Sequence, residues 1–143
     1  MCLTAKNNHC FRVATKDIVC YKVVRGEHLR DTNNPNKHTS NLRYFTPYTM
    51  TLLPDEVING TVPFEAKGTC QTFRYKDECL IEKGYIHTFA EYPKNWAAKH
   101  SCGWFEVFVF KCIIPKGTRY VKGTFEGTTA YASKKIVFVE QGI

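Results

Sequence analysis

Residues 105–114, FEVFVFKCII, form an apolar run in which only Glu106 and Lys111 are charged. A strand with one face in water alternates apolar and polar residues. A near-continuous run of aromatic and branched residues is instead typical of a strand covered on both faces. The run is longer than most strands, so we expect a bend or a bulge within it. The pattern therefore predicts a long buried strand around which the rest of the chain is organised.

The C-terminal part of the chain continues the strand pattern. Pro115 has no N–H to donate to a ladder and Gly117 can adopt positive φ, so a turn is predicted after the long strand. Residues 118–125 resume as a strand, in which Gly123 predicts a bulge. A short apolar run at 136–139 has charges on both sides and predicts a last strand inside the sheet.

The N-terminal half alternates a strong strand pattern with polar residues. Residues 17–24, DIVCYKVV, are branched and aromatic without a breaker, and they predict a strand that ends at Arg25-Gly26. The polar residues 27–40 predict a long loop. A loop of this length in a compact domain is often functional or disordered.

The remaining segments predict short strands and one helix. Residues 1–16 are predicted to form a short edge strand or an ordered arm, and further short strands are predicted at 61–66, 70–76 and 79–83. Pro93 suits the first turn of a helix and Gly103 a C-cap, so a helix is predicted between them. Many strands, one or two short helices and no βαβ alternation predict an α+β fold, a single compact domain over residues 1–143 with a mostly antiparallel or mixed sheet.

Composition supports an ordered core and argues against a membrane protein. The chain has 143 residues, of which 43% are hydrophobic and 14% aromatic, enough to bury a sizeable core. It contains no run of about 18 apolar residues, so no transmembrane helix is expected. The first ten residues lack the apolar segment of a signal peptide. We therefore expect a soluble, cytoplasmic protein with no membrane partner.

The chain has an odd number of cysteines, seven, at positions 2, 10, 20, 70, 79, 102 and 112. Cys20 and Cys112 fall in predicted strands, where a thiol acts as a small buried hydrophobe. Free thiols in a reducing compartment are therefore favoured over a disulfide framework. Cys2, His9 and Cys10 lie close together, but no CxxC or HxxxH completes a zinc site. No metal is predicted.

The net charge of +7 is concentrated in the N-terminal third of the chain. A basic surface attracts nucleic acid or another acidic partner. A solvated, soluble surface is the favoured explanation of the charge, since the chain has no Arg-rich run and no aromatic-basic RNA-binding motif. Nucleic-acid binding is therefore a hypothesis that rests on charge alone.

Two segments carry side chains suited to binding. Arg43, Tyr44, Thr46 and Tyr48 could line a ligand pocket, although a rigid turn packed on the core is the simpler interpretation. His87 is predicted to follow a strand and precede a helix, where it could bind a ligand or act as a general base. The alternative for His87 is a hydrogen bond to its own turn.

Familiar catalytic motifs are absent from the sequence. It has no GxSxG, P-loop, GxGxxG or HExxH. The paired acids Asp55-Glu56 and Asp77-Glu78 fall in predicted turns rather than at a useful spacing. Nothing singles out one Cys–His pair from the seven cysteines and five histidines. An enzyme is not excluded, but a protein without catalytic activity and without a cofactor is favoured.

Several segments together resemble small uncharacterised proteins of bacteriophages and gut bacteria. They are GYIHTFA, NWAA, KCIIPKGTRYVKG, YASKKIVFVE, the start MCL, IVCYKVV and FTPY, and they cover most of the chain. The resemblance implies a phage or prophage accessory protein of the bacterial cytoplasm. The family has no settled activity, so it implies no catalytic residue.

The order of the predicted elements also resembles compact ADP-ribosyltransferases of the rifampicin-modifying kind. This second resemblance implies an NAD cleft near Tyr21 or Arg25, then Tyr85 and His87, and finally Glu140. The chain departs from that pattern because its first strand lacks a His-Gly pair and no acidic pair precedes the last strand. A shared fold does not by itself imply a shared activity.

Three hypotheses follow. The first is a small basic accessory protein that holds a protein partner or a small nucleotide-like ligand, without catalysis, through the segment Arg43–Tyr48 and the region of His87. The alternative is an ADP-ribosyltransferase-like enzyme or a degenerate NAD-binding relative. The third is a nucleic-acid-binding protein. The oligomeric state does not follow from the sequence.

Overall fold

The fold is built on antiparallel β-strands. The computed structural model describes residues 3–6, 11–30, 38–47, 51–67, 71–75, 78–94 and 105–141. The elements in them are β1 (Leu3–Lys6), β2 (Arg12–Val13), β3 (Ile18–Arg30), β4 (His38–Phe45), β5 (Leu52–Leu53), α1 (Asp55–Ile58), β6 (Phe64–Glu65), β7 (Gln71–Tyr75), β8 (Glu78–Lys83), β9 (Ile86–Phe89), β10 (Phe105–Ile114), β11 (Arg119–Phe125), β12 (Thr128–Ser133) and β13 (Lys135–Gln141).

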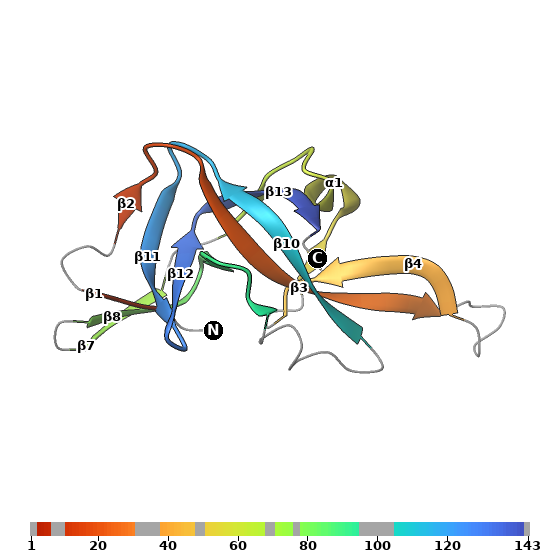
Figure 1. The fold of residues 1–143 in the computed structure, drawn as a ribbon, viewed down its shortest axis with the longest axis horizontal. Helices are drawn as coiled ribbons and strands as arrows, with labels where there is room; N and C mark the ends of the chain where they lie inside the picture. The colour runs from red at the N-terminus through yellow and green to blue at the C-terminus, as the bar shows by residue number, and fades with distance from the viewer. Residues whose placement is uncertain are drawn as a thin grey trace.

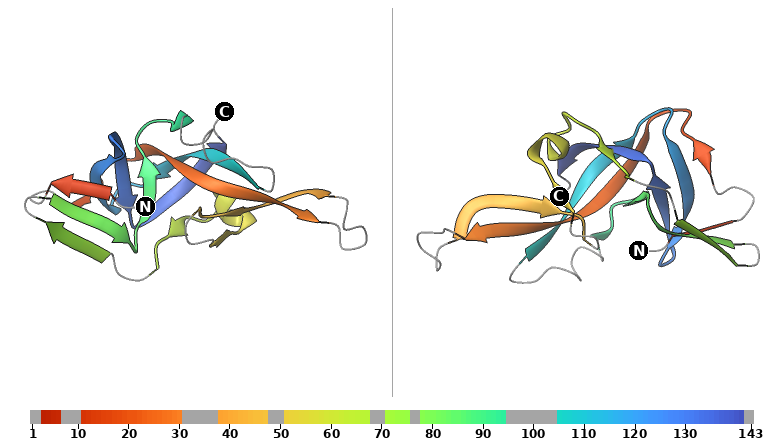
Figure 2. Two further views of the ribbon diagram at one scale, coloured as in Figure 1. Left: turned by 90° about the horizontal axis from the view of Figure 1, so that it is seen from below. Right: turned by 180° about the vertical axis from the view of Figure 1, so that it is seen from behind.

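The described strands join into one sheet that curls into a half-barrel (Figures 1 and 2). Its order is β6-β13-β10-β3-β9-β12-β11-β1-β8-β7, with β2 paired to β11 and β4 paired to both β3 and β5. The pairings between these strands are antiparallel. The hairpin of β3 and β4 extends away from the rest of the sheet in Figure 1.

The two longest strands, β3 and β10, pair continuously from Phe105↔Glu27 to Ile114↔Ile18. The long buried strand predicted at 105–114 is confirmed as β10. The expected irregularity is also present, because the register between β10 and β13 shifts between Lys111 and Cys112. The last strand, β13, lies between β10 and β6, inside the sheet as predicted.

Side chains alternate between the two faces of β3, and each face carries its own apolar cluster. We call these the Tyr21 face and the Cys20 face. The cluster on the Tyr21 face draws on seven strands and contains Leu3, Ala5, Val23, Ile81, Phe89, Val109, Val121, Ala130 and Ala132. The cluster on the Cys20 face contains Ala14, Cys20, Val24, Leu53, Val57, Ile86, Phe110, Cys112, Ile114, Ile136 and Phe138. Both faces of the central strands are therefore covered, as the unbroken apolar run of β10 requires.

The prediction that the first strong strand ends at Arg25-Gly26 is wrong, because β3 continues to Arg30. A Cβ on Gly26 would lie 2.5 Å from Cε2 of Phe108, so the missing side chain makes room for that ring. Phe108 packs edge-to-face on Tyr44 there, with ring centroids 5.6 Å apart. Gly26 therefore allows cross-strand packing and does not form a turn. The predicted loop 27–40 is correspondingly shorter, and residues 31–37 lie outside the described part of the chain.

The bulge predicted at Gly123 is also wrong. The pairing of β11 with β12 is regular from Tyr120↔Ser133 to Phe125↔Thr128. A Cβ on Gly123 would collide with the backbone carbonyl of Thr4 in β1. The segment β1 is not the edge strand expected at the start of the chain, because it lies between β11 and β8. The glycine allows this close approach.

Most of the predicted helix lies outside the described residues. The prediction of a strand-rich, mostly antiparallel fold is confirmed. The helix predicted between Pro93 and Gly103 lies, beyond Lys94, outside the described residues, so the α+β class and the single domain stay predictions. The helix α1 was not predicted. It follows Pro54, has acidic residues in its first turn and buries Val57 in the cluster of the Cys20 face.

Within the described part of the chain, no helix has the length and apolar character needed to cross a membrane.

We expect Gly123→Ala to lower the free energy of unfolding by about 1–3 kcal/mol, because the added methyl group overpacks the contact with β1. The adjacent exposed residue provides the control, since Lys122→Ala should change stability by less than about 0.5 kcal/mol. Urea unfolding of both variants measures the difference. Equal stabilities for the two variants would contradict the close approach of β1 to β11.

Candidate functional site

Most of the predicted site residues lie on the Tyr21 face. Tyr21 and Arg25 are on β3, and Arg43 lies on the same side because it pairs with Glu27. His87 and Phe89 alternate with Thr88 on β9, and Phe89 belongs to the cluster of the Tyr21 face. Tyr85 packs against the same cluster. Tyr48 lies outside the described residues.

Aromatic rings lie at both ends of β9 on this face. The register between β3 and β9 consists of one residue pair, Tyr21↔Phe89. The Tyr21 ring stands edge-on to Tyr92 with centroids 5.9 Å apart. The Tyr85 ring stands edge-on to Phe11 at 6.0 Å. Edge-to-face pairs of this kind fix ring orientation, so these tyrosines present a defined aromatic surface.

Among the charged residues of this face, Lys111 lies directly opposite Tyr21, whereas Arg25, Glu27 and Arg43 lie together further along β3. Nη2 of Arg25 lies 2.9 Å from Oε1 of Glu27, and both side chains are about a third exposed, so this ion pair orients the groups more than it stabilises the fold. Arg43 lies opposite Glu27, six residues along β3 from Tyr21. At the rise of a strand this is about 20 Å. Arg43 and Tyr21 therefore do not share one small ligand.

His87 lies in the middle of β9, so its predicted position in a loop between a strand and a helix is wrong. The turn occurs earlier, at Gly84, whose φ is +95°. Both ring nitrogens of His87 are buried. A general base has to reach the proton it removes, so a substrate would contact this ring only after neighbouring side chains move.

A buried polar cluster on the Cys20 face was missed by the sequence analysis. It consists of Cys20 and Lys22 on β3, Cys112 on β10 and Thr88 on β9, and we call it the Lys22 cluster. Cys20 and Cys112 are directly opposite each other, fully buried and not in a disulfide. Lys22 is only 8% exposed, and its Nζ donates a hydrogen bond of 3.1 Å to the main-chain oxygen of His87.

Burial dominates the electrostatics of this cluster. Loss of water lowers the pKa of Lys22 from 10.5 to about 8, with a smaller opposing effect from the two thiols. Burial raises the pKa of Cys20 from 9.0 to about 11, and the Thr88 hydroxyl and the Lys22 charge oppose this rise. The pKa of Cys112 is raised further, by burial and then by Cys20. Both thiols therefore stay protonated at neutral pH and are weak nucleophiles.

The Lys22 cluster has a structural role at the junction of β3 and β9. The ladder between these strands stops after one pair, and the Lys22 ammonium supplies the donor that the His87 carbonyl needs. A lysine inside the apolar run DIVCYKVV is the feature that could have revealed the cluster, since a lysine is rarely buried without a partner.

One geometric observation supports the alternative of an ADP-ribosyltransferase-like enzyme. Lys111 of β10 lies directly opposite Tyr21 of β3 on one side and Glu140 of β13 on the other. Tyr21 and Glu140 are thus two strand spacings apart, about 10 Å. Of the residues that the second resemblance implies, Tyr21 and Glu140 thus lie on the two strands that flank β10, with Lys111 between them.

No group of three or more metal-ligating side chains occurs in the part of the chain that the structure describes. The segment with Cys2, His9 and Cys10 lies outside it.

We expect Lys22→Met to change the dependence of stability on pH. A folded-state pKa near 8 means that the unfolded chain binds more protons than the folded chain above this pH, so Lys22 makes stability rise with pH. Relative to the variant, the wild type should gain about 1 kcal/mol between pH 7 and pH 9. Urea unfolding of both proteins measures this difference.

The interval from pH 6 to pH 7 is the internal control, because Lys22 is charged in both states there and the difference should be constant. Measurements stay below pH 9, since above it the raised pKa values of the two thiols lower stability with rising pH. A constant difference from pH 6 to pH 9 would show that Lys22 is not desolvated.

In comparisons with known proteins, no family model, no curated protein and no solved structure matches this chain. Both family resemblances therefore stay predictions.

Proposed function

We propose that the protein binds a small anionic, nucleotide-like ligand on the Tyr21 face, without catalysing a reaction. The observation that supports this most is the direct pairing of half-buried Tyr21 and Lys111 at the junction of β3, β9 and β10, with half-buried Arg25 further along the same face of β3. Partly exposed aromatic rings beside cations suit a ligand that is both planar and negatively charged.

The spacing of these side chains favours an extended ligand. Lys111 lies directly across from Tyr21, so a phosphate at Lys111 leaves a ring system within reach of the tyrosine. Arg25 is four residues further along β3, about 14 Å away. A free phosphate contacts only one of these cations, whereas a nucleotide diphosphate or a nucleotide sugar spans both.

The absence of catalysis is part of the proposal. It is supported by the buried ring nitrogens of His87 and by the raised pKa values of the Cys20 and Cys112 thiols. On this proposal the protein acts as a phage or prophage accessory factor in the bacterial cytoplasm. The support for that setting is the resemblance of GYIHTFA and KCIIPKGTRYVKG to such proteins.

A transferase that uses NAD is the second candidate, favoured by the row Tyr21, Lys111, Glu140 across three strands. On that alternative Glu140 would contact the ribose next to the bond that breaks. Release of nicotinamide from NAD, abolished by Glu140→Gln, would establish it in place of simple binding.

Binding is tested by thermal shift with ADP, ADP-ribose and NAD. Ligand at about a hundred times its dissociation constant adds about 2.7 kcal/mol to stability, which is easily detected in a chain of this size. We expect Arg25→Gln and Lys111→Gln each to weaken binding roughly tenfold, because each removes a charge-assisted hydrogen bond.

Arg43→Gln is the matched control. Arg25 and Arg43 both neighbour Glu27, but Arg43 lies opposite a position two residues further from Tyr21 along β3 than Arg25 does. The control should bind like the wild type. Equal losses in the two arginine variants, or no shift with any of the three compounds, would contradict a ligand site on the Tyr21 face.

A further inference from the structure

A second group of cations and aromatic rings lies on the Cys20 face, where β2, β11 and β12 are side by side. There Arg12 of β2 pairs directly with Tyr120 of β11, and Lys122 of β11 pairs directly with Tyr131 of β12. Directly paired side chains lie on the same face of a sheet, so two cations and two tyrosines alternate over three adjacent strands. We call these four residues the cation–tyrosine patch.

The patch is accessible and its rings are ordered. Arg12 and Lys122 are exposed, and the two tyrosines are half-buried. The Tyr120 and Tyr131 rings stand edge-to-face with centroids 6.1 Å apart, and both pack on the cluster of the Cys20 face. The pair Thr124↔Thr129 continues the same face with exposed polar side chains. Lys122 and Thr124 on this face remain exposed.

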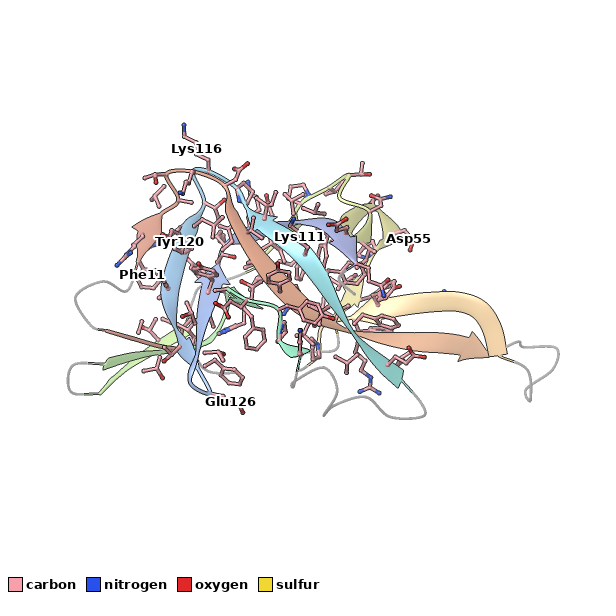
Figure 3. All side chains as sticks on the ribbon, in the orientation of Figure 1. Phe11, Asp55, Lys111, Lys116, Tyr120 and Glu126 are labelled. Atoms are coloured by element: carbon pink, nitrogen blue, oxygen red, sulfur yellow. The ribbon has the colours of Figure 1, made fainter. Side chains whose placement is uncertain are left out.

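More cations surround the patch. Main-chain hydrogen bonds from Ala14 to Thr118, from Gly117 to Ala14 and from Lys134 to Arg119 hold residues 11–17, 115–122 and 134 side by side. The exposed charged residues of these segments are Arg12, Lys16, Lys116, Arg119, Lys122 and Lys134, against one carboxylate, Asp17. Figure 3 shows Phe11, Tyr120 and Lys116 at this end of the molecule, while Glu126 lies at the opposite end of β11.

The reverse side of the same edge repeats the pairing of cation and ring. Arg119 alternates with Tyr120 on β11, so it lies on the opposite face. Its guanidinium carbon is 4.4 Å from the centroid of the Phe11 ring. Phe11 is 37% exposed. The β2–β11 edge is therefore basic and aromatic on both sides.

We propose that the cation–tyrosine patch binds single-stranded nucleic acid. Single strands are held by cations that follow the phosphates and by aromatic rings on which bases stack. Charge alone would suit any acidic partner, but the alternation of rings and cations over neighbouring strands favours a polymer that alternates bases and phosphates. The patch shares no residue with the ligand site on the Tyr21 face, so either proposal can fail without the other.

Fluorescence anisotropy with labelled oligo(dT) and oligo(rU) tests the proposal at low salt and over a salt series. We expect affinity to fall steeply with salt, and the double variant Arg12→Gln, Lys122→Gln to bind at least tenfold more weakly. Each lost phosphate contact should also reduce the salt slope by about 0.7. The control is Arg43→Gln, Lys94→Gln, which removes the same two charge types at exposed positions outside the patch and should bind like the wild type.

Variants of Tyr120 distinguish the contribution of base stacking to binding from that of charge. Tyr120→Phe keeps the ring and should bind like the wild type, while Tyr120→Leu should bind roughly tenfold more weakly. Undetectable binding at low salt overturns the proposal. So do equal losses in the two double variants, which would mean that net charge alone acts. Equal competition by polyglutamate with no effect of Tyr120→Leu would identify an acidic protein partner and overturn it as well.

Discussion

The pairing of β3 with β10 is the constraint on which the rest of the structure depends. It joins Ile18–Glu27 to Phe105–Ile114 without interruption, and the other strands of the sheet extend from its two sides. Because side chains alternate along β3, this one register decides which residues face each apolar cluster. A shift by one residue would exchange Tyr21 and Arg25 with Cys20 and Lys22. The separation of the two proposed binding sites onto opposite faces is therefore a consequence of this ladder.

Lys22 shows how the two faces are connected. Its side chain lies among buried groups on the Cys20 face, and it holds the carbonyl of His87, whose ring belongs to the Tyr21 face. Burying an ammonium group is unfavourable unless the group is hydrogen-bonded. Here the hydrogen bond from Lys22 to the His87 carbonyl takes the place of further ladder bonds between β3 and β9, which form only one residue pair. Burial of the ammonium group in this arrangement lowers the pKa of Lys22. The position of β9, and with it the surroundings of Tyr21, thus depends on a residue that no ligand contacts.

Much of the sheet could be predicted from the sequence because local patterns specify it. The apolar run of β10, the turn at Gly117 and the last strand depend on residue type and spacing alone. The glycines were the main source of error. Gly26 and Gly123 were interpreted as a strand end and a bulge, yet each serves a contact with a residue distant in sequence, Phe108 and Thr4. Such contacts are set by the tertiary fold and leave no local pattern.

The same limit applies to the candidate sites. Tyr21, Arg25, Tyr85 and His87 could be proposed from the sequence, but only the register shows that they share a face and that Arg43 lies beside Glu27, six residues along β3 from Tyr21. Lys111, the Lys22 cluster and the cation–tyrosine patch arise from pairs such as Lys111↔Tyr21, Cys20↔Cys112 and Lys122↔Tyr131, which join residues far apart in the chain. Composition shows that the chain is basic, but it does not show where the cations lie on the folded surface.

We propose that the two faces of one sheet bind different ligands. An NMR titration of the ¹⁵N-labelled protein with ADP-ribose distinguishes the two faces. We expect the amide shifts to gather at Tyr21, Arg25, Phe89 and Lys111 and to leave Arg12 and Lys122 unmoved. Shifts that gather instead at β2 and β11, or that spread evenly over both faces, would contradict it.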